Sequence, residues 1–253
     1  MDWNKTKKIF IFLLIAVNIV LFGLNLNNIR KYKISSEQEK TIYKVMSENG
    51  ITLYTDIVKD FSPKRQISAE ISAIDSAGLT AAFFAENEMF FQKVEFDKTI
   101  FYSDNKTLTI SGNNIAFENN KGTGAFSGLS GDKAISAAES YLKGLSYDFG
   151  NFAADNVIYD EGNYVVTFVD SFRGYKVFSS MAKVYVSEEG ITKFEVSLFK
   201  LISFTGSETD IKSCDEALLT FLYEMKNQER NRDIFIEDLE FGYFLQDNGV
   251  IAE

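Results

Sequence analysis

The feature that most constrains this chain is an uncharged, strongly apolar run near the amino terminus, residues 9–26 (IFIFLLIAVNIVLFGLNL). Fourteen of these 18 residues are Ile, Leu, Val or Phe. As an α-helix the run is about 27 Å long, close to the roughly 30 Å hydrocarbon core of a bilayer. We therefore predict that residues 9–26 form a transmembrane helix.

The residues after the run distinguish a permanent anchor from a removable signal peptide. A signal peptide has an apolar region of about 7–15 residues and then small residues at its cleavage site. Here the run is longer and continues into Asn25, Asn27, Asn28 and Arg30. We predict an uncleaved signal anchor; a cleaved signal peptide and a buried core helix are the alternatives. Because no second long apolar run follows, the protein is expected to be single-pass.

Basic residues flank the run on both sides, and the orientation of a membrane helix follows their bias. They are Lys5, Lys7 and Lys8 before the run, and Arg30, Lys31 and Lys33 after it. With three on each side, the charge count does not decide which end faces the cytoplasm. Basic flanks favour anionic headgroups, so membrane lipid is an expected partner.

The rest of the chain is acidic. Removing the six Lys/Arg and one Asp of residues 1–33 from totals of 26 and 36 leaves 20 basic and 35 acidic residues, a net charge of −15. Such a body repels phosphate backbones, so no nucleic-acid partner is expected. The one cysteine cannot form an intramolecular disulfide, which fits an exported domain without a disulfide framework.

Residues 34–253 are numerous enough for one or two small domains, and their many aromatic residues predict a packed core rather than disorder. The glycine-rich stretch 119–133 (NNKGTGAFSGLSGDK) is the one obvious candidate for a flexible linker. We therefore predict a first lobe at residues 34–120 and a second lobe at residues 131–253.

The first lobe begins with SSEQEKTIYKVMSENG, where Ile42, Val45 and Met46 share a helical face and Gly50 ends the helix. The expected elements after it are strands at 51–58 and 67–74, a short helix at 79–84, and a hairpin formed by KTLTI and NIAFE.

The second lobe begins with a helix, DKAISAAESYLKGL, followed by a predicted antiparallel meander. Its strands are NVIY, YVVTFVD, MAKVYVS and ITKFEVSLF, with DEGN and EEG as turns. At Ser213 the pattern restarts: Ser213 and Glu216 form an S-x-x-E capping box, and a helix is expected to about residue 227. Strands IFIEDLE and GYFL and the turn QDNG follow, and the chain then stops at Glu253. We expect this partial repeat to be truncated.

These patterns together predict an α+β protein. One N-terminal transmembrane helix precedes a mixed domain of helix-plus-antiparallel-meander units.

The side chains on which most hydrolytic chemistry depends are absent or isolated. The chain has no histidine, which removes the commonest general base, the His-dependent nucleophile systems and the His-dependent zinc sites. Cys214 lies at a helix start without a partner and is expected to be structural. The glycines of the 119–133 loop match neither phosphate-binding fingerprint, so no cofactor is expected.

Three acidic groups are candidates for Ca²⁺ binding or for a carboxylate pair. They are Asp160 with Glu161, Glu188 with Glu189, and Glu237 with Asp238 and Glu240. None has EF-hand spacing and two of them lie in predicted turns, so all three are interpreted as solvated surface. No catalytic or metal-binding residue is assigned.

Asn18 is the one polar residue near the middle of the predicted span. Buried in lipid, an amide gains modestly, about 0.6–2 kcal/mol, from a hydrogen bond to another helix. Two readings stay open: Asn18 contacts a partner helix, or it has no role.

The quoted segments resemble a known family. The opening MDWNKTKKIFIFLLIAVNIVLF is similar to the amino terminus of the YycI family, and KTLTISGNNIAFEN and GYKVFSSMAKVYVSEEGITKFE are similar to segments of its extracytoplasmic part. The resemblance implies a YycH/YycI-like domain outside the plasma membrane of a Gram-positive bacterium, with residues 1–8 as a cytoplasmic tail.

The resemblance also implies a function. Members act without catalytic residues, together with the sister protein YycH, on the sensor histidine kinase of the WalK/WalR (YycG/YycF) two-component system that controls cell-wall metabolism. The contacts are expected to run largely through membrane helices. The alternative is a membrane-tethered binding module or peptidase inhibitor, because the helix-plus-meander units also resemble PepSY-type domains. A wall-active hydrolase with two carboxylates is the third reading.

Overall fold

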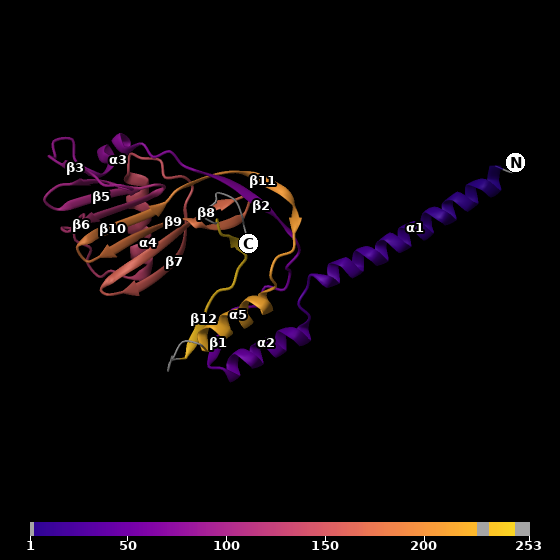
Figure 1. Cartoon of the computed structure of the whole chain (residues 1–253). Helices are drawn as coiled ribbons and strands as arrows, with labels where there is room; N and C mark the ends of the chain where they lie inside the picture. Colours follow the sequence, from indigo (N-terminus) through magenta and orange to yellow (C-terminus); the bar gives the residue numbers. More distant parts are fainter. Residues whose placement is uncertain (1–2, 227–232, 246–253) are drawn as a thin grey trace. The chain divides into compact units, whose positions relative to one another are not determined.

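A computed structural model describes residues 3–226 and 233–245 (Figure 1). The chain divides into two compact units, and neither is the contiguous lobe expected from the sequence. Unit 1 comprises Met1–Arg65 and Ser207–Phe241, and unit 2 comprises Gln66–Gly206 and Gly242–Glu253. The predicted turn QDNG and the chain end at Glu253 lie outside the described residues.

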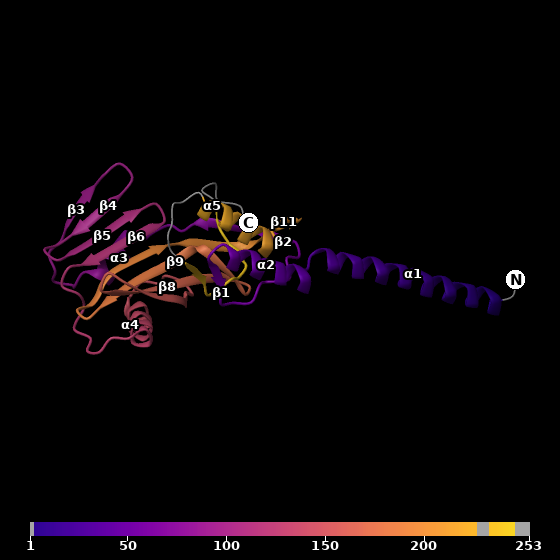
Figure 2. The same cartoon turned by 90° about the horizontal axis from the view of Figure 1, so that it is seen from below.

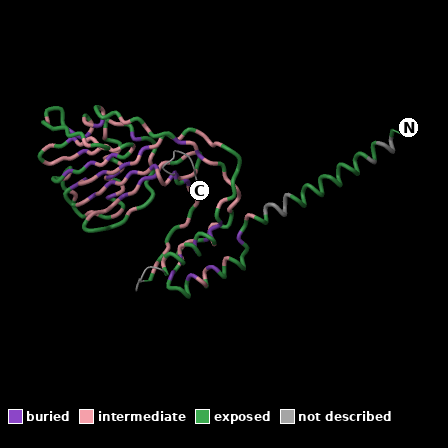
Figure 3. The backbone as a smooth tube through the Cα atoms, in the orientation of Figure 1, coloured by how far each residue is buried: buried purple, intermediate pink, exposed green. Residues whose placement is uncertain are grey.

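Helix α1 (Trp3–Lys31, 29 residues) contains the apolar run. Its described side chains from Phe10 to Leu24 are all exposed, as Figure 3 shows along most of the helix. From Phe10 to Leu24 apolar residues lie on every side, so this described part of α1 has no polar face to turn toward water. Over the stretches that the structure describes, we find no helix with both the length and the apolarity that a membrane crossing requires.

The globular part of unit 1 joins segments from both ends of the chain. Its elements are α2 (Ser36–Glu48), β1 (Ile51–Leu53), α5 (Cys214–Lys226) and β12 (Ile234–Ile236). Strands β1 and β12 pair in parallel, with Ile51 opposite Ile234. Helices α2 and α5 contribute most of the small apolar core, which contains Ile34, Ile42, Met46, Ile51, Ile57, Cys214, Leu218 and Leu222.

Helix α2 confirms the predicted helix and shows a complete capping box at its start. The Ser35 hydroxyl accepts from the N–H of Gln38, and the Gln38 side chain accepts from the N–H of Ser35 (2.9 Å). At the other end the chain turns at Gly50, whose φ of +74° favours glycine.

Unit 2 is built on a nine-stranded sheet. Eight strands follow the order β3-β4-β5-β6-β10-β9-β8-β7, and β13 pairs with β9 in parallel. The strands are β3 (Phe91–Val94), β4 (Thr99–Tyr102), β5 (Lys106–Ser111), β6 (Asn114–Asn119), β7 (Ala153–Asp160), β8 (Asn163–Phe172), β9 (Tyr175–Ser187), β10 (Gly190–Ser197) and β13 (Gly242–Tyr243). The KTLTI/NIAFE hairpin (β5–β6) and the meander β7–β10 are confirmed.

Helices α3 (Ser76–Phe83) and α4 (Gly131–Gly144) pack on the same face of this sheet; Figure 2 shows α4 along one side of the strands. Phe83 of α3 and Tyr141 of α4 both contact the ring of Phe194, which is fully buried. The period-2 alternation of the strands places their apolar residues on this face. Strands β2 (Lys64–Ile71) and β11 (Phe199–Thr209) form a separate two-stranded sheet.

The lobe boundary expected at 119–133 is not a boundary of the structure, because β6 before the glycine-rich loop pairs with β10 after it. The loop instead lies against the β9–β10 turn. Gly124 N–H donates to Glu189 O (3.2 Å) and Phe126 N–H donates to Glu188 O (2.8 Å). A Cβ on Gly122 would lie 2.0 Å from Glu189 O, so this glycine permits a close approach of two backbones.

The partial repeat expected from Ser213 does not form a second meander. Helix α5 begins at Cys214 as predicted, but β12 pairs with β1 of unit 1 and β13 pairs with β9 of unit 2. Strands with the predicted local pattern thus pair with strands from earlier in the chain instead of with each other. The hairpin β3–β4 was missed, because FQKV lacks the alternation that marks a half-buried strand.

Candidate functional site

Asn18, the residue predicted to mediate interaction, has a hydrogen-bond partner within its own helix. Its Nδ2 donates to the carbonyl oxygen of Leu14 (2.8 Å), one helical turn earlier. The side chain lies among Ile15, Ile19 and Phe22. One amide N–H is therefore satisfied locally, and the amide oxygen is left to accept a hydrogen bond from another molecule. Whether Asn18 has a partner helix stays a prediction.

The segment directly after α1 is attached to the rest of unit 1 by main-chain bonds. Ile34 N–H donates to Lys59 O (2.9 Å), and Phe61 N–H donates to Tyr32 O (3.0 Å). Lys33 and Asp60 form an antiparallel bridge between these bonds. Ile34 is 5% exposed and belongs to the core of unit 1. We call residues 31–34, 59–61 and Asp210 the junction.

Side chains extend the junction to the second segment of unit 1. Lys31 Nζ donates to the hydroxyl of Tyr32 (3.1 Å), and this hydroxyl donates to Asp210 Oδ1 (2.9 Å). The hydrogen bond to Tyr32 and the nearby negative charge of Asp210 raise the pKa of Lys31. The Tyr32 ring packs edge-on against Phe61, with centroids 5.9 Å apart.

The Asp60 side of the junction is also held in place. The hydroxyl and the N–H of Ser62 both donate to Asp60, and these hydrogen bonds lower the pKa of its carboxyl group. Lys59 forms an ion pair with Glu39 of α2 (2.8 Å). A displacement of the carboxyl end of α1 would therefore act directly on α2 and on the segment around Asp210.

The junction was not predicted from the sequence. Tyr32 and Asp210 are 178 residues apart in the chain, and no local pattern marks residues that meet only after the unit has closed. The one available signal was composition: a tyrosine among basic residues directly after a long apolar run.

Cys214 has the surroundings expected of a structural residue. It is 6% exposed and lies in the core of unit 1 with Leu218 and Leu222. Burial raises the pKa of its thiol, although a hydrogen bond with the backbone of Val58 acts in the opposite direction. A raised pKa keeps a thiol protonated and unreactive near neutral pH.

The acidic groups singled out in the sequence do not converge on a common site. Asp160 and Glu161 lie at the β7–β8 turn, Glu188 and Glu189 at the β9–β10 turn, and Glu237 follows β12. Within residues 3–226 and 233–245, no three His, Cys, Asp or Glu side chains gather closely enough to hold a metal ion.

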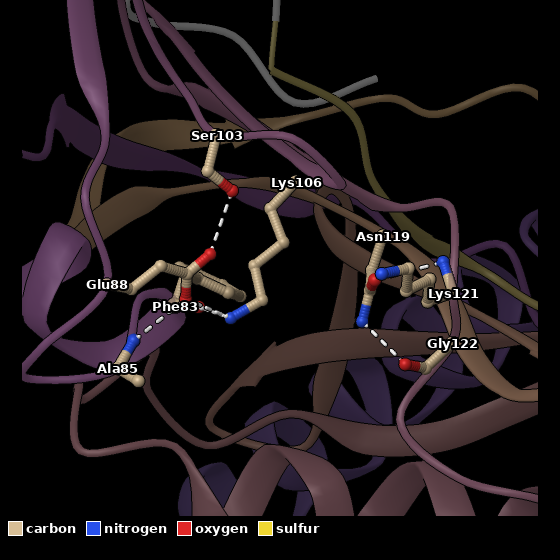
Figure 4. A network of polar contacts seen from close by, with 8 residues as sticks. All are labelled: Phe83, Ala85, Glu88, Ser103, Lys106, Asn119, Lys121 and Gly122. Atoms are coloured by element: carbon tan, nitrogen blue, oxygen red, sulfur yellow. Dashed lines mark hydrogen bonds and ion pairs between the residues drawn. The ribbon is translucent and has the colours of Figure 1, made fainter.

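One well-connected carboxylate lies elsewhere, in unit 2 (Figure 4). Glu88 pairs with Lys106 (2.6 Å) and also accepts from the Ser103 hydroxyl (2.8 Å) and the Ala85 N–H (3.1 Å). Lys106 donates in addition to Phe83 O (3.0 Å). Burial opposes ionisation, but these hydrogen bonds outweigh it and lower the pKa of Glu88. All its partners belong to the fold, so the network fastens the loop after α3 to the β4–β5 hairpin.

Comparison with known proteins identifies the family. The sequence matches the family model described as YycI protein over residues 29–251. No curated protein matches it.

Two solved structures are similar at 12% identity and a TM-score of 0.49. One is an uncharacterized protein from Eubacterium rectale ATCC 33656, with 79% of each chain covered. The other is YycH from Bacillus subtilis, with 77% of this chain and 54% of that chain covered, so the match spans about half of YycH. Since the family match extends over most of the chain, from the end of α1 through both units, the protein belongs to the YycI family.

Proposed function

We propose that this protein is a membrane-anchored, non-enzymatic accessory regulator of a sensor histidine kinase of the WalK/YycG kind, acting with a YycH-like sister protein on cell-wall metabolism. The observation that carries the proposal is the YycI family match over residues 29–251. The absence of histidine from the whole chain and the structural surroundings of Cys214 favour regulation over catalysis.

Residues 9–26 are the proposed anchor in the plasma membrane, with the amino terminus cytoplasmic and the two units extracytoplasmic. Two observations support it: the run is uncharged and apolar, and α1 exposes apolar side chains all around its axis from Phe10 to Leu24. The run also includes Ile9, Asn25 and Leu26, whose side chains the structure does not describe. In a bilayer these apolar side chains would contact lipid hydrocarbon instead of water.

The proposed mechanism is a shift between signalling states of the kinase complex. A partner can shift such an equilibrium only by binding the two states with different affinity. Helix α1 would pack beside kinase or sister helices, with Asn18 in the contact. The junction would transmit a displacement of α1 to α2 and to the segment around Asp210, because Tyr32 contacts both Phe61 and Asp210.

A helix exchange tests the role of α1. Replacing residues 9–26 by a poly-Leu span should leave the protein inserted and folded but abolish regulation, measured as expression of a kinase-dependent reporter. Full regulation after the exchange would refute the proposed role of the helix. It would favour the alternative of a tethered binding module or PepSY-type inhibitor, whose activity depends on the extracytoplasmic part alone.

Photocrosslinking identifies the partner. A photoreactive residue at position 18 should capture a sensor kinase or a YycH-like protein in living cells, identified by mass spectrometry. The same photoreactive residue placed at position 12 is the matched control, because Phe12 is also exposed on α1. It should capture less of this partner than position 18 does. Reproducible silence at position 18 in correctly inserted protein would reduce α1 to a tether.

A conservative substitution tests the junction. Tyr32→Phe removes the hydroxyl that joins Lys31 to Asp210 but keeps the ring that packs on Phe61. We expect normal insertion and weakened regulation. Tyr54→Phe is the control, since Tyr54 is also in unit 1 and is 68% exposed. An unchanged reporter response with Tyr32→Phe would contradict transmission through this hydroxyl.

A further inference from the structure

The hairpin β3–β4 and the two residues before it expose several large apolar side chains. Six lie between residues 89 and 102: Met89, Phe90, Phe91, Val94, Phe96 and Tyr102. Val94 is 70% exposed, and Phe96 is exposed completely. A large aromatic side chain buries roughly 150–250 Å² when covered. These six side chains therefore expose several hundred Å² of apolar surface along this part of the chain.

The same hairpin forms one edge of the nine-stranded sheet. In the described sheet, β4 is the one strand paired with β3, so the other side of β3 presents main-chain groups that a further strand can bind (Figure 1). Natural edge strands are usually short, charged or covered. Strand β3 is short and carries Lys93, but it also exposes Phe91 and Val94, which a second strand on this edge would cover.

The hydrogen bonds of the hairpin show which residues face outward. Glu95 N–H donates to Lys98 O (2.8 Å), and the register continues with Lys93 opposite Ile100. Because hydrogen-bonding direction alternates along a strand, Lys93 and Glu95 direct their main-chain groups toward β4. Gln92 and Val94 therefore direct theirs away from the sheet, toward the open edge.

The charges on β3 are complementary to those of a second copy of the same strand in one register. In a two-fold antiparallel pair, residues whose main-chain groups point to the open edge must lie opposite each other. If the axis passes through Val94, Lys93 of each copy lies opposite Glu95 of the other copy, so the pair has two such contacts. Moving the centre by one residue places Lys93 opposite Lys93, or Glu95 opposite Glu95, and like charges directly opposite are destabilising.

We propose that β3 is a homodimerisation edge, on which a second copy of this chain pairs antiparallel about a two-fold axis at Val94. On one face the pair brings together the two Val94 side chains, which are 70% exposed in the single chain. On the other face lie the two Lys93–Glu95 contacts. Lys93 and Glu95 already form an ion pair within the hairpin (2.8 Å), with Lys93 64% exposed, so dimerisation would extend an existing pair.

The opposite edge of the sheet lacks this self-complementarity. Strand β7 also exposes apolar side chains, with Ile158 56% exposed. Its charged residues, Asp155 and Asp160, are both acidic. Two copies of β7 would therefore place negative charges near each other without a basic residue of that strand to match them.

Disulfide trapping in the full-length chain tests the axis. Residues at the centre of a hydrogen-bonded antiparallel pair have Cα atoms about 5.5 Å apart, which suits a disulfide. Val94→Cys, oxidised in membranes with copper–phenanthroline, should give a dimer on a non-reducing gel. Ile158→Cys, on the other edge, should not. No dimer with Val94→Cys in folded protein, or equal dimer with Ile158→Cys, would overturn the proposal.

Charge reversal tests the register, and the mixed dimer of the two variants serves as the control for their folding. In the Val94→Cys background, Lys93→Glu alone and Glu95→Lys alone should each lose most of the cross-link, because each places like charges opposite each other. Coexpressed with different tags, the two variants should cross-link with one another, because each supplies the charge that the other lacks. Unchanged cross-linking in either single variant, or no mixed dimer, would contradict this register.

Discussion

Units 1 and 2 differ in how far apart in the chain their core segments lie. Among the residues that the structure describes, the core of unit 1 contains eight buried apolar residues and joins residues 34–57 with 214–222. The main core of unit 2 contains nineteen described residues, all between Leu79 and Leu198. A smaller core buries less apolar surface and so stabilises less. Joining segments that lie farther apart in the chain also costs more conformational entropy. Unit 1, to which α1 is joined, should therefore be the less stable unit.

The first test of this comparison is the centre of unit 2. Phe194 is fully buried and contacts Phe83, Tyr141 and Phe149. Phe194→Ala should lower the free energy of unfolding of unit 2 by about 3–5 kcal/mol, measured by urea denaturation. Phe194→Leu, which keeps more of the volume, should cost less. A loss below about 1 kcal/mol would mean that this ring does not support the core.

The second test addresses unit 1. Met46 of α2 is fully buried in the core of unit 1. Met46→Ala should therefore lower the free energy of unfolding of unit 1 by about 2–5 kcal/mol. Met46→Leu should cost less than about 1.5 kcal/mol. We expect Met46→Ala to speed amide hydrogen exchange in α2 and α5 of unit 1. The exchange rates in β8 and β9 of unit 2 should be unchanged. Equal destabilisation of both units would break the comparison.

The third test uses the pH dependence of unit 2. Glu88→Gln removes the charge that pairs with Lys106 and should cost about 1–3 kcal/mol at neutral pH. Because the folded-state pKa of Glu88 is lowered, its contribution is present above the unfolded-state pKa of about 4.3. The difference between wild type and variant should begin to shrink below this value and disappear as pH falls through the lower folded-state pKa of Glu88. Glu86→Gln, at an exposed position in the same loop, is the control.

The smallest expected effect is at the start of α2. Ser35→Ala removes the hydroxyl that accepts from Gln38 N–H and should cost about 0.5–2 kcal/mol, again confined to unit 1. Ser36→Ala, at the first residue of the helix, should be nearly neutral. If both variants behave alike in thermal denaturation, the capping box does not stabilise unit 1.

Much of the local structure could be predicted. The α2 helix, the β5–β6 hairpin and the β7–β10 meander follow from apolar periodicity and turn residues. The DEGN turn is an example: Glu161 and Gly162 both have positive φ, as a two-residue hairpin requires. These features depend on neighbours in the chain, so the sequence contains the information directly.

The division into units was not predictable from the same patterns. The glycine-rich loop resembled a linker in composition, yet Gly122 and Gly190 allow backbones to approach within one unit. Likewise, IFIEDLE and GYFL have local strand character, but no local signal specified that β12 would pair with β1 and β13 with β9.

The sequence by itself determined the composition of α1, the alternation of the strands, the net negative charge and the absence of histidine chemistry. Only the tertiary structure brought Tyr32 to Asp210 and placed β3 at the end of the strand order in the described sheet. The physical reason is that secondary structure depends on periodicity and propensity over a few residues. The partners of a strand edge or a hydroxyl depend on which distant segments bury their apolar faces together.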